Sequence, residues 1–132
     1  MHIKKTAKQE TKPLYPDLSY TIVGACYKAH NDLGRFCRER QYGDVLEKLF
    51  KGEGVRYVRE FDLRQLGKKI EGNIVDFIVE DKILLDLKAK RIVTKEDYYQ
   101  MVRYLQSSGL TLGLIVNFRS VYLSPKRVVN FN

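Results

Sequence analysis

The chain has few of the residues from which covalently or metal-stapled folds are built. Among its 132 residues there are two cysteines, Cys26 and Cys37, and two histidines, His2 and His30. Two cysteines in a chain of this length do not make a disulfide framework. Both lie in apolar patterns of helical spacing, so we expect free thiols rather than a disulfide or a zinc site.

Long apolar runs are also missing. No window approaches the roughly 20 apolar residues of a membrane-spanning helix, and residues 1–13 are basic without the apolar core of a secretory signal. We therefore expect a cytoplasmic protein with no membrane partner. Acidic residues are in deficit, at 16 against 24 lysines and arginines, which gives a net charge of +8. This excess favours a polyanionic partner, nucleic acid before membrane.

The length suits a single domain. Residues 1–17 are polar and include Pro13 and Pro16, which predicts a flexible basic arm before one domain over 18–132. Apolar periodicity predicts helices over 19–33, 36–51 and 94–107, with Ser19 and Thr94 as N-caps. Strands are predicted over 55–63, 69–79, 83–89, 111–117 and 121–129, with a turn at 65–68. This order predicts an α/β (α+β) domain with a mixed sheet.

Three charged residues interrupt two strands that are otherwise apolar. Residues 74–79 and 83–88 read as strands covered on both faces, yet they contain Asp76, Asp86 and Lys88. Burying an unpaired charge is expensive, so these interruptions need a cause. Either the three residues form an active site, or they lie on a solvated face as a surface ion pair.

The turn between the two strands decides between these interpretations. A two-residue loop, Glu80-Asp81, would direct Asp76 and Asp86 to opposite faces, whereas a loop over 80–82 would oppose them on one face. Opposed carboxylates repel each other unless a cation lies between them, and Mg²⁺ favours carboxylates together with water and phosphate oxygens. Lys88 shares a face with Asp86 and would stabilise a developing charge or orient a water. The active-site hypothesis therefore predicts the odd-length loop.

Residues in the flanking segments have both a functional and a structural interpretation. Glu39 falls on the core-facing stripe of the second helix, as a third carboxylate at the site or as a partner of the helix dipole. Gln100 and Tyr104 flank the apolar face of the last helix and either border the site or face solvent. Four basic residues either hold phosphates or form a solvated basic face: Lys90, Arg91, Lys95 and Arg103.

Several sequence blocks, taken in order, resemble one protein family. Residues 14–20, 22–25 and 30–34 match its opening, Glu39 and Tyr42 match an ExxY motif, and Asp86-Leu87-Lys88 follows Asp76 as (D/E)xK follows PD. Residues 100–105 match QxxxYL on the next helix, and 113–118 match a late strand. In this order the blocks resemble the GxxExxY proteins, a branch of the PD-(D/E)xK nuclease superfamily. Phe36 departs from the pattern, because the family usually has glycine there.

The resemblance implies a restriction-endonuclease-like fold and a set of roles. Asp76, Asp86 and the Leu87 carbonyl would hold Mg²⁺, or Mn²⁺, with Glu39 as an accessory acidic ligand. Lys88 would be the catalytic lysine, and Gln100 and Tyr104 would border the site. The expected function is Mg²⁺-dependent hydrolysis of nucleic acid, with DNA favoured, and a homodimer would supply the two sites that double-strand cleavage often uses. The alternatives are an inactive nucleic-acid-binding module and a protein-interaction module that retains the fold.

Overall fold

The computed structural model describes residues 14–66 and 73–131. The elements in chain order are α2 (Pro16–Leu33), α3 (Glu39–Gly52), β1 (Tyr57–Asp62), the 3₁₀ helix η1 (Leu63–Leu66), β2 (Ile74–Val79), β3 (Ile83–Lys88), α4 (Lys95–Ser108), β4 (Leu112–Asn117) and β5 (Lys126–Val129). The strands form one sheet in the order β1-β2-β3-β4-β5. Among the described strands only β3 and β4 pair in parallel, and α4 connects them, as a parallel crossover requires. The predicted mixed sheet flanked by helices is confirmed.

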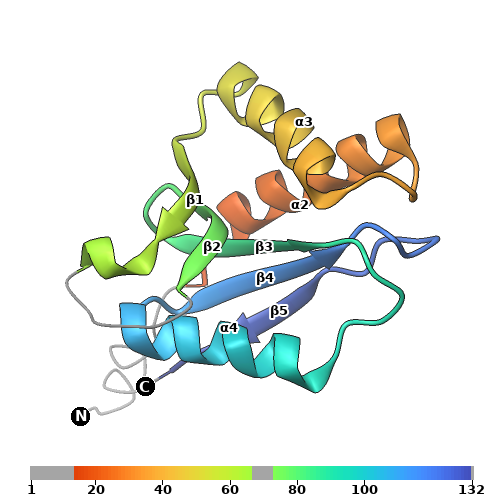
Figure 1. Cartoon of the computed structure of the whole chain (residues 1–132). Helices are drawn as coiled ribbons and strands as arrows, with labels where there is room; N and C mark the ends of the chain where they lie inside the picture. The colour runs from red at the N-terminus through yellow and green to blue at the C-terminus, as the bar shows by residue number, and fades with distance from the viewer. Residues whose placement is uncertain (1–13, 67–72, 132) are drawn as a thin grey trace, which may run out of the picture.

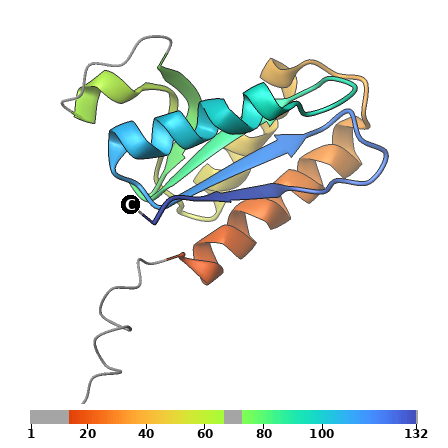
Figure 2. The ribbon, with the colours of Figure 1, turned by 90° about the horizontal axis from the view of Figure 1, so that it is seen from below.

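The helices cover both faces of the sheet (Figures 1 and 2). On one face α2 and α3 pack over an apolar cluster that includes Ile22, Leu46, Phe77 and Leu85. On the other face α4 packs over a smaller cluster that includes Leu84, Met101 and Ile115. Alternate residues of β3 therefore enter different cores, which explains why the strand is apolar at nearly every position.

The starts of the first two helices differ from the predicted ones, while the helix stops agree. The prediction of Ser19 as an N-cap is wrong: α2 begins at Pro16, after Tyr15 with a φ of 48°, and no side chain caps it. Proline suits this position because the first turn of a helix leaves its N–H groups unpaired. The second helix begins at Glu39 rather than near 36. Thr94 does cap α4, and Gly109 ends it with a φ of 78°.

Two predicted strands begin five residues later among the described residues. The strand predicted over 121–129 begins only at Lys126, since Pro125 before it has no N–H to donate to a ladder. The strand predicted over 69–79 begins at Ile74 among the described residues, and 67–72 lie outside them, as do 1–13 of the predicted arm. The turn predicted at 65–68 overlaps η1.

The β1–β2 ladder is interrupted at one point, opposite Asp76. Tyr57 to Arg59 pair with Phe77 to Val79, and Phe61 and Asp62 pair with Ile74 and Val75, but Glu60 is skipped. Glu60 has a φ of 52°, an unusual conformation for a residue other than glycine. Phe77 packs into the α2–α3 core, whereas Val75 packs into the α4 core. The strands therefore bend at Asp76, and Figure 1 shows β1 and β2 curving away from β3.

Candidate active site

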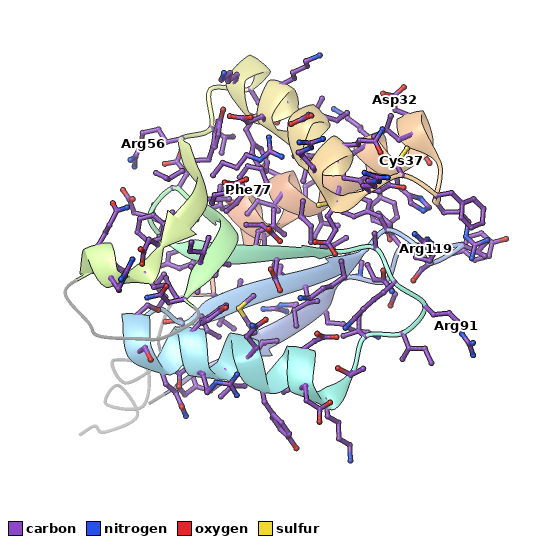
Figure 3. The ribbon with its side chains drawn as sticks, in the orientation of Figure 1. Asp32, Cys37, Arg56, Phe77, Arg91 and Arg119 are labelled. Atoms are coloured by element: carbon purple, nitrogen blue, oxygen red, sulfur yellow. The ribbon has the colours of Figure 1, made fainter. Side chains whose placement is uncertain are left out.

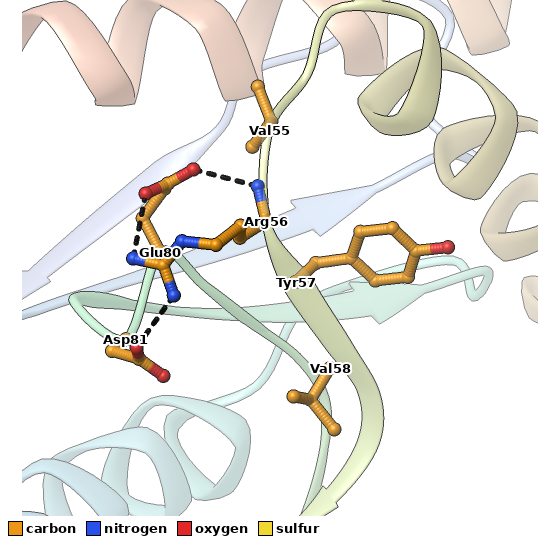
Figure 4. A pocket seen from close by; sticks show the side chains of 6 residues that line it. All are labelled: Val55, Arg56, Tyr57, Val58, Glu80 and Asp81. Atoms are coloured by element: carbon orange, nitrogen blue, oxygen red, sulfur yellow. Dashed lines mark hydrogen bonds and ion pairs between the residues drawn. The ribbon is translucent and has the colours of Figure 1, made fainter.

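The turn between β2 and β3 has the odd length that the active-site hypothesis requires. Val79 pairs with Ile83, so Glu80, Asp81 and Lys82 form the connection. Glu80 and Asp81 have φ values of 53° and 57°, a left-handed conformation that needs support from outside the turn. Arg56 supplies it through ion pairs of 3.1 Å to Glu80 and 3.0 Å to Asp81 (Figure 4). These three residues also line a surface hollow, and their ion pairs stabilise the turn whose length sets the β2–β3 register.

Continuing this register places Asp76 opposite Asp86. The β2–β3 pairing ends at Phe77 and Leu85, because β2 bends away at Asp76. The amide of Leu87 consequently has no strand partner there, and the Asp76 Oδ2 atom accepts its hydrogen bond at 2.6 Å. The carboxylate thus replaces the missing strand and is held in place by the backbone of β3.

The two carboxyl groups lie close enough to alter ionisation. Asp86 is buried, with 8% of its surface exposed. Burial, a hydrogen bond with Asp86 and the Asp86 charge raise the pKa of Asp76 to about 7, against the opposing effect of the Leu87 amide. Two carboxyl groups facing each other, one buried and one half-buried, cannot both ionise cheaply, so Asp76 keeps its proton to a higher pH than an exposed aspartate does.

Lys88 joins this pair from two positions further along β3. Its Nζ atom lies 3.0 Å from Asp86 Oδ2 and 3.7 Å from Asp97 Oδ1 of α4. Burial alone would lower the pKa of Lys88, but the charges of Asp86, Asp97 and Glu39 raise it. The interpretation of Asp76, Asp86 and Lys88 as an exposed ion pair is therefore wrong, because all three side chains converge on the α4 face of the sheet.

Sequence reasoning missed Asp97 as a residue of this site. Asp97 closes the capping box with Thr94 and also forms ion pairs with Lys88 and Lys90. Burial alone would raise the pKa of Asp97, but hydrogen bonds from Lys90 and Thr94 lower it to about 2. The available signal in the sequence was its position three residues after a capping threonine. That this position lies opposite the end of the DxK strand is visible only in the structure.

Glu39 lies at the edge of the site. It is exposed at the first position of α3, not on the core-facing stripe predicted for it, because the helix begins at this residue. Its Oε2 atom accepts a hydrogen bond of 3.2 Å from the Ala89 amide, just beyond Lys88. Its charge also contributes to the raised pKa of Asp76. The N-terminus of α3 therefore brings a third carboxylate beside the end of β3.

On α4 the two predicted bordering residues are placed differently. Tyr104 was predicted to flank the apolar face of the helix, but it is 4% exposed and belongs to that face, together with Met101 and Leu105. Burial and the nearby charge of Asp86 raise the pKa of Tyr104, so its hydroxyl stays protonated. Gln100, one turn earlier, is half-buried.

The four predicted phosphate-binding residues divide into two groups. Lys90 is engaged by Asp97, so it belongs to the network around Lys88. Arg91, Lys95 and Arg103 are exposed, and Figure 3 shows Arg91 projecting from the end of the molecule where β3 ends. Of the four predicted residues, Arg91, Lys95 and Arg103 therefore present their charge to solvent.

Asn117 is a second residue that sequence reasoning passed over. It ends β4 beside Lys88 and is buried, with 8% of its surface exposed. Its Oδ1 atom accepts from the amides of Lys90 at 3.1 Å and Arg119 at 3.2 Å, and its Nδ2 atom donates to the Lys90 carbonyl at 2.7 Å. A polar residue that closes a run of five apolar or small residues was the signal. Asn117 fixes the chain that leaves the site.

The donor set suits Mg²⁺ better than a metal that needs a full protein cage. Among residues 14–66 and 73–131, no group of three or more His, Cys, Asp and Glu side chains is close enough to hold a metal ion. The site instead offers two carboxylates, Asp76 and Asp86, beside the backbone of Leu87. Mg²⁺ is ordinarily bound by one or two carboxylates, with waters and substrate phosphates completing its shell. A cation would also replace the proton that the Asp76–Asp86 pair retains.

Comparison with known proteins agrees with this geometry. The family model described as the PD-(D/E)XK nuclease superfamily matches residues 16–128. The chain belongs to the PD-(D/E)XK nuclease superfamily. No curated protein and no solved structure matches it. The superfamily match spans α2 to β5 and therefore includes the bent hairpin, the DxK strand and α4, so the mixed sheet is a restriction-endonuclease-like fold. No helix in the part of the chain that the structure describes is long and apolar enough to cross a membrane.

Proposed function

We propose that this chain is a Mg²⁺-dependent nuclease of the GxxExxY branch that hydrolyses phosphodiester bonds in nucleic acid, with DNA as the favoured substrate. The observation that carries the proposal is the convergence of Asp76, Asp86 and Lys88, in a register set by a three-residue turn. A structural ion pair requires one acid and one base. Asp76 is a second acid beside this pair, and burial and the neighbouring Asp86 raise its pKa, which favours a functional site.

The metal-binding residues in this proposal are Asp76 and Asp86, with the Leu87 carbonyl as a third oxygen ligand and Glu39 acting through water. A bound Mg²⁺, or Mn²⁺ in its place, would polarise the scissile phosphate and lower the pKa of the attacking water. Glu39 accepts a hydrogen bond from the Ala89 amide, which keeps its carboxylate beside the end of β3 that carries Lys88.

Lys88 would change partners when a cation occupies the site. With Asp86 committed to the cation, Asp97 remains as the carboxylate that holds the Lys88 ammonium, and the raised pKa keeps that group protonated. A protonated Lys88 then stabilises the charge that develops on the phosphate. Asp97 is in this view a positioning residue: it acts through Lys88 rather than on the substrate.

The remaining polar residues would orient and bind the substrate. Gln100 and the protonated Tyr104 would border the site from α4, while Arg91, Lys95 and Arg103 would contact phosphates. The net charge of +8 makes affinity steeply dependent on salt. A homodimer would allow cleavage of both strands of a duplex, and sedimentation of the full chain with and without DNA tests it.

The decisive experiment is cleavage of labelled single- and double-stranded DNA in Mg²⁺, in Mn²⁺ and in EDTA. Wild type is compared with Asp86→Asn and Lys88→Ala. The control for loss of a carboxylate is Glu53→Gln at the far end of α3, where Glu53 forms an exposed ion pair with Lys28. We expect metal-dependent cleavage that both site variants abolish and the control retains. DNA binding without cleavage under any metal would instead support the alternative, an inactive nucleic-acid-binding module.

A further inference from the structure

Two loops lie side by side at the end of the molecule where β3 and β4 finish. Residues 34–38 connect α2 to α3, and residues 118–125 connect β4 to β5. Their arginines exchange hydrogen bonds: Arg35 Nε donates to the Arg119 carbonyl at 2.8 Å, and Arg119 Nε donates to the Arg35 carbonyl at 2.9 Å. Figure 3 labels Arg119 and Cys37 at this junction. The exchange fixes the two loops relative to each other without using apolar contacts.

These loops expose aromatic side chains that the core does not use. Phe36 is 73% exposed and Tyr122 is 86% exposed. The guanidinium carbons of Arg35 and Arg119 lie 4.6 Å and 5.5 Å from the centre of the Phe36 ring. Tyr122 and Arg35 line one surface hollow, and we call Arg35, Phe36, Arg119 and Tyr122 the arginine–aromatic surface. A large exposed ring beside two cations contributes little to folding and suits a partner with both negative charge and flat rings.

The arginine–aromatic surface is joined to the candidate active site by the backbone. The Phe118 amide donates to the Lys88 carbonyl at 2.8 Å, and the Arg119 amide shares Asn117 Oδ1 with the Lys90 amide. On the other loop, Phe36 lies three residues before Glu39, whose carboxylate accepts from Ala89. A nucleic-acid strand that passes Lys88 and continues outward over the two joined loops therefore meets this surface next.

We propose that the arginine–aromatic surface stacks unpaired bases of the substrate, so that the preferred substrate is single-stranded or locally unpaired nucleic acid. This inference rests on the proposed nuclease function and adds the substrate class. In a duplex the faces of the bases are covered by their neighbours, whereas an unpaired base offers a face to Phe36 or Tyr122. The charges of Arg35 and Arg119 complement the phosphates between such bases, and arginine also stacks on bases.

The test is equilibrium binding of fluorescein-labelled oligonucleotides to the full chain in EDTA, where no metal-dependent cleavage occurs. The probes are oligothymidine of about a dozen nucleotides, a size within the range of known single-strand sites, and a blunt hairpin duplex of similar length. The variants are Phe36→Ala, Tyr122→Ala and their combination, with Phe36→Trp as the conservative change. Tyr20→Ala is the matched control, since Tyr20 is 82% exposed on α2 and outside both loops.

We expect each alanine variant to weaken single-strand binding about tenfold, from the loss of one stacked base, and duplex binding by less than about twofold. Phe36→Trp should retain single-strand affinity and quench a 2-aminopurine placed in the oligonucleotide, and Tyr20→Ala should bind as wild type does. Three results would overturn the inference: no single-strand binding by wild type, equal losses for both probes, or no loss in the double variant. A single-strand preference in a protein that never cleaves would instead refute only the nuclease proposal.

Discussion

The two faces of β3 are built from alternating residues of one strand, yet they depend on different physical terms. Leu85 and Leu87 enter the core under α2 and α3, which is apolar throughout. Asp86 and Lys88 point to the α4 side, where Leu84 is apolar but the end of the strand is charged. Asp86 is nearly as buried as its neighbours, so burial alone does not distinguish the two faces.

The two faces differ in the interactions that their buried side chains require. Leucines need only area removed from water, which α2 and α3 supply. Asp86 needs a counter-charge and Asp76 needs a donor, and these come from Lys88 and from the Leu87 amide. A buried ionic group is often replaceable by an apolar one at little cost to stability, whereas a new charge in an apolar core is not. The α4 face thus uses charges that folding does not require.

The largest expected effect comes from exchanging the chemistry of the two faces. Leu85→Asp should unfold the chain, because it places an unpaired carboxylate in the closed core at a cost above about 4 kcal/mol. Asp86→Leu should remain folded, since Lys88 keeps Asp97, but should cleave at least about a thousandfold more slowly. Circular-dichroism melting and the cleavage assay measure both. Comparable losses of stability in the two variants would contradict the distinction between the faces.

The raised pKa of Asp76 predicts how stability depends on pH. In the unfolded chain this carboxyl loses its proton near pH 4, but in the metal-free native state only at about 7. The native state therefore binds more protons across this window, and its stability falls as pH rises from about 4 to about 7. The total loss is of the order of 1–4 kcal/mol. Below the window the favourable contribution is fully present.

Mg²⁺ sharpens this prediction because it competes with the proton. We expect Mg²⁺ to raise the melting temperature by several degrees at about pH 8, and much less at about pH 5.5, where Asp76 is protonated. Asp76→Asn should remove both the Mg²⁺ effect and the slope of stability with pH. Calorimetric melting across the pH range measures this without relying on activity, and a Mg²⁺ effect that is independent of pH would exclude Asp76 as a ligand.

A smaller effect is expected at Asp97, because this residue both caps α4 with Thr94 and forms an ion pair with Lys88. Asp97→Asn should lower kcat about 10- to 100-fold, in line with losses at outer-shell partners. It should also lower the pKa of Lys88 and move the alkaline limb of the pH–rate profile to lower pH. Thr94→Ala is the matched control: it costs about 1 kcal/mol of helix capping and leaves that limb in place. If the alkaline limb of the pH–rate profile stays in place in Asp97→Asn, Asp97 serves only to cap the helix.

The smallest effects are expected at the exposed basic residues. Arg91→Ala and Lys95→Ala should each weaken DNA binding a few-fold and reduce the salt slope by about 1, the value for one phosphate contact. Arg64→Ala serves as the control, since Arg64 lies on η1 at the other end of the molecule and is paired with Asp62. Titration by anisotropy at several salt concentrations separates the variants, and equal slopes in all three would remove Arg91 and Lys95 from the interface.

Much of the fold could be predicted from local patterns. Helix stops at Gly34 and Gly109 and the Thr94 cap follow from chemistry within a few residues. The failures also come from reasoning over a few residues at a time. Ser19 was predicted as an N-cap from its residue type, but α2 begins at Pro16 and has no side-chain cap. Tyr104 was judged from helical spacing alone, and only the position of α4 on the sheet shows that it is buried.

The amino-acid sequence by itself determined which residue types were available for chemistry: two aspartates and a lysine within two apolar strands, and an excess of basic residues over the whole chain. Only the tertiary structure decided that they meet. The three-residue turn stabilised by Arg56 sets the register, the bend at Glu60 and Asp76 frees the Leu87 amide, and α4 brings Asp97 to Lys88. The physical reason is that side-chain alternation fixes a face only relative to the neighbouring strand, and that relation is set by contacts distant in the sequence.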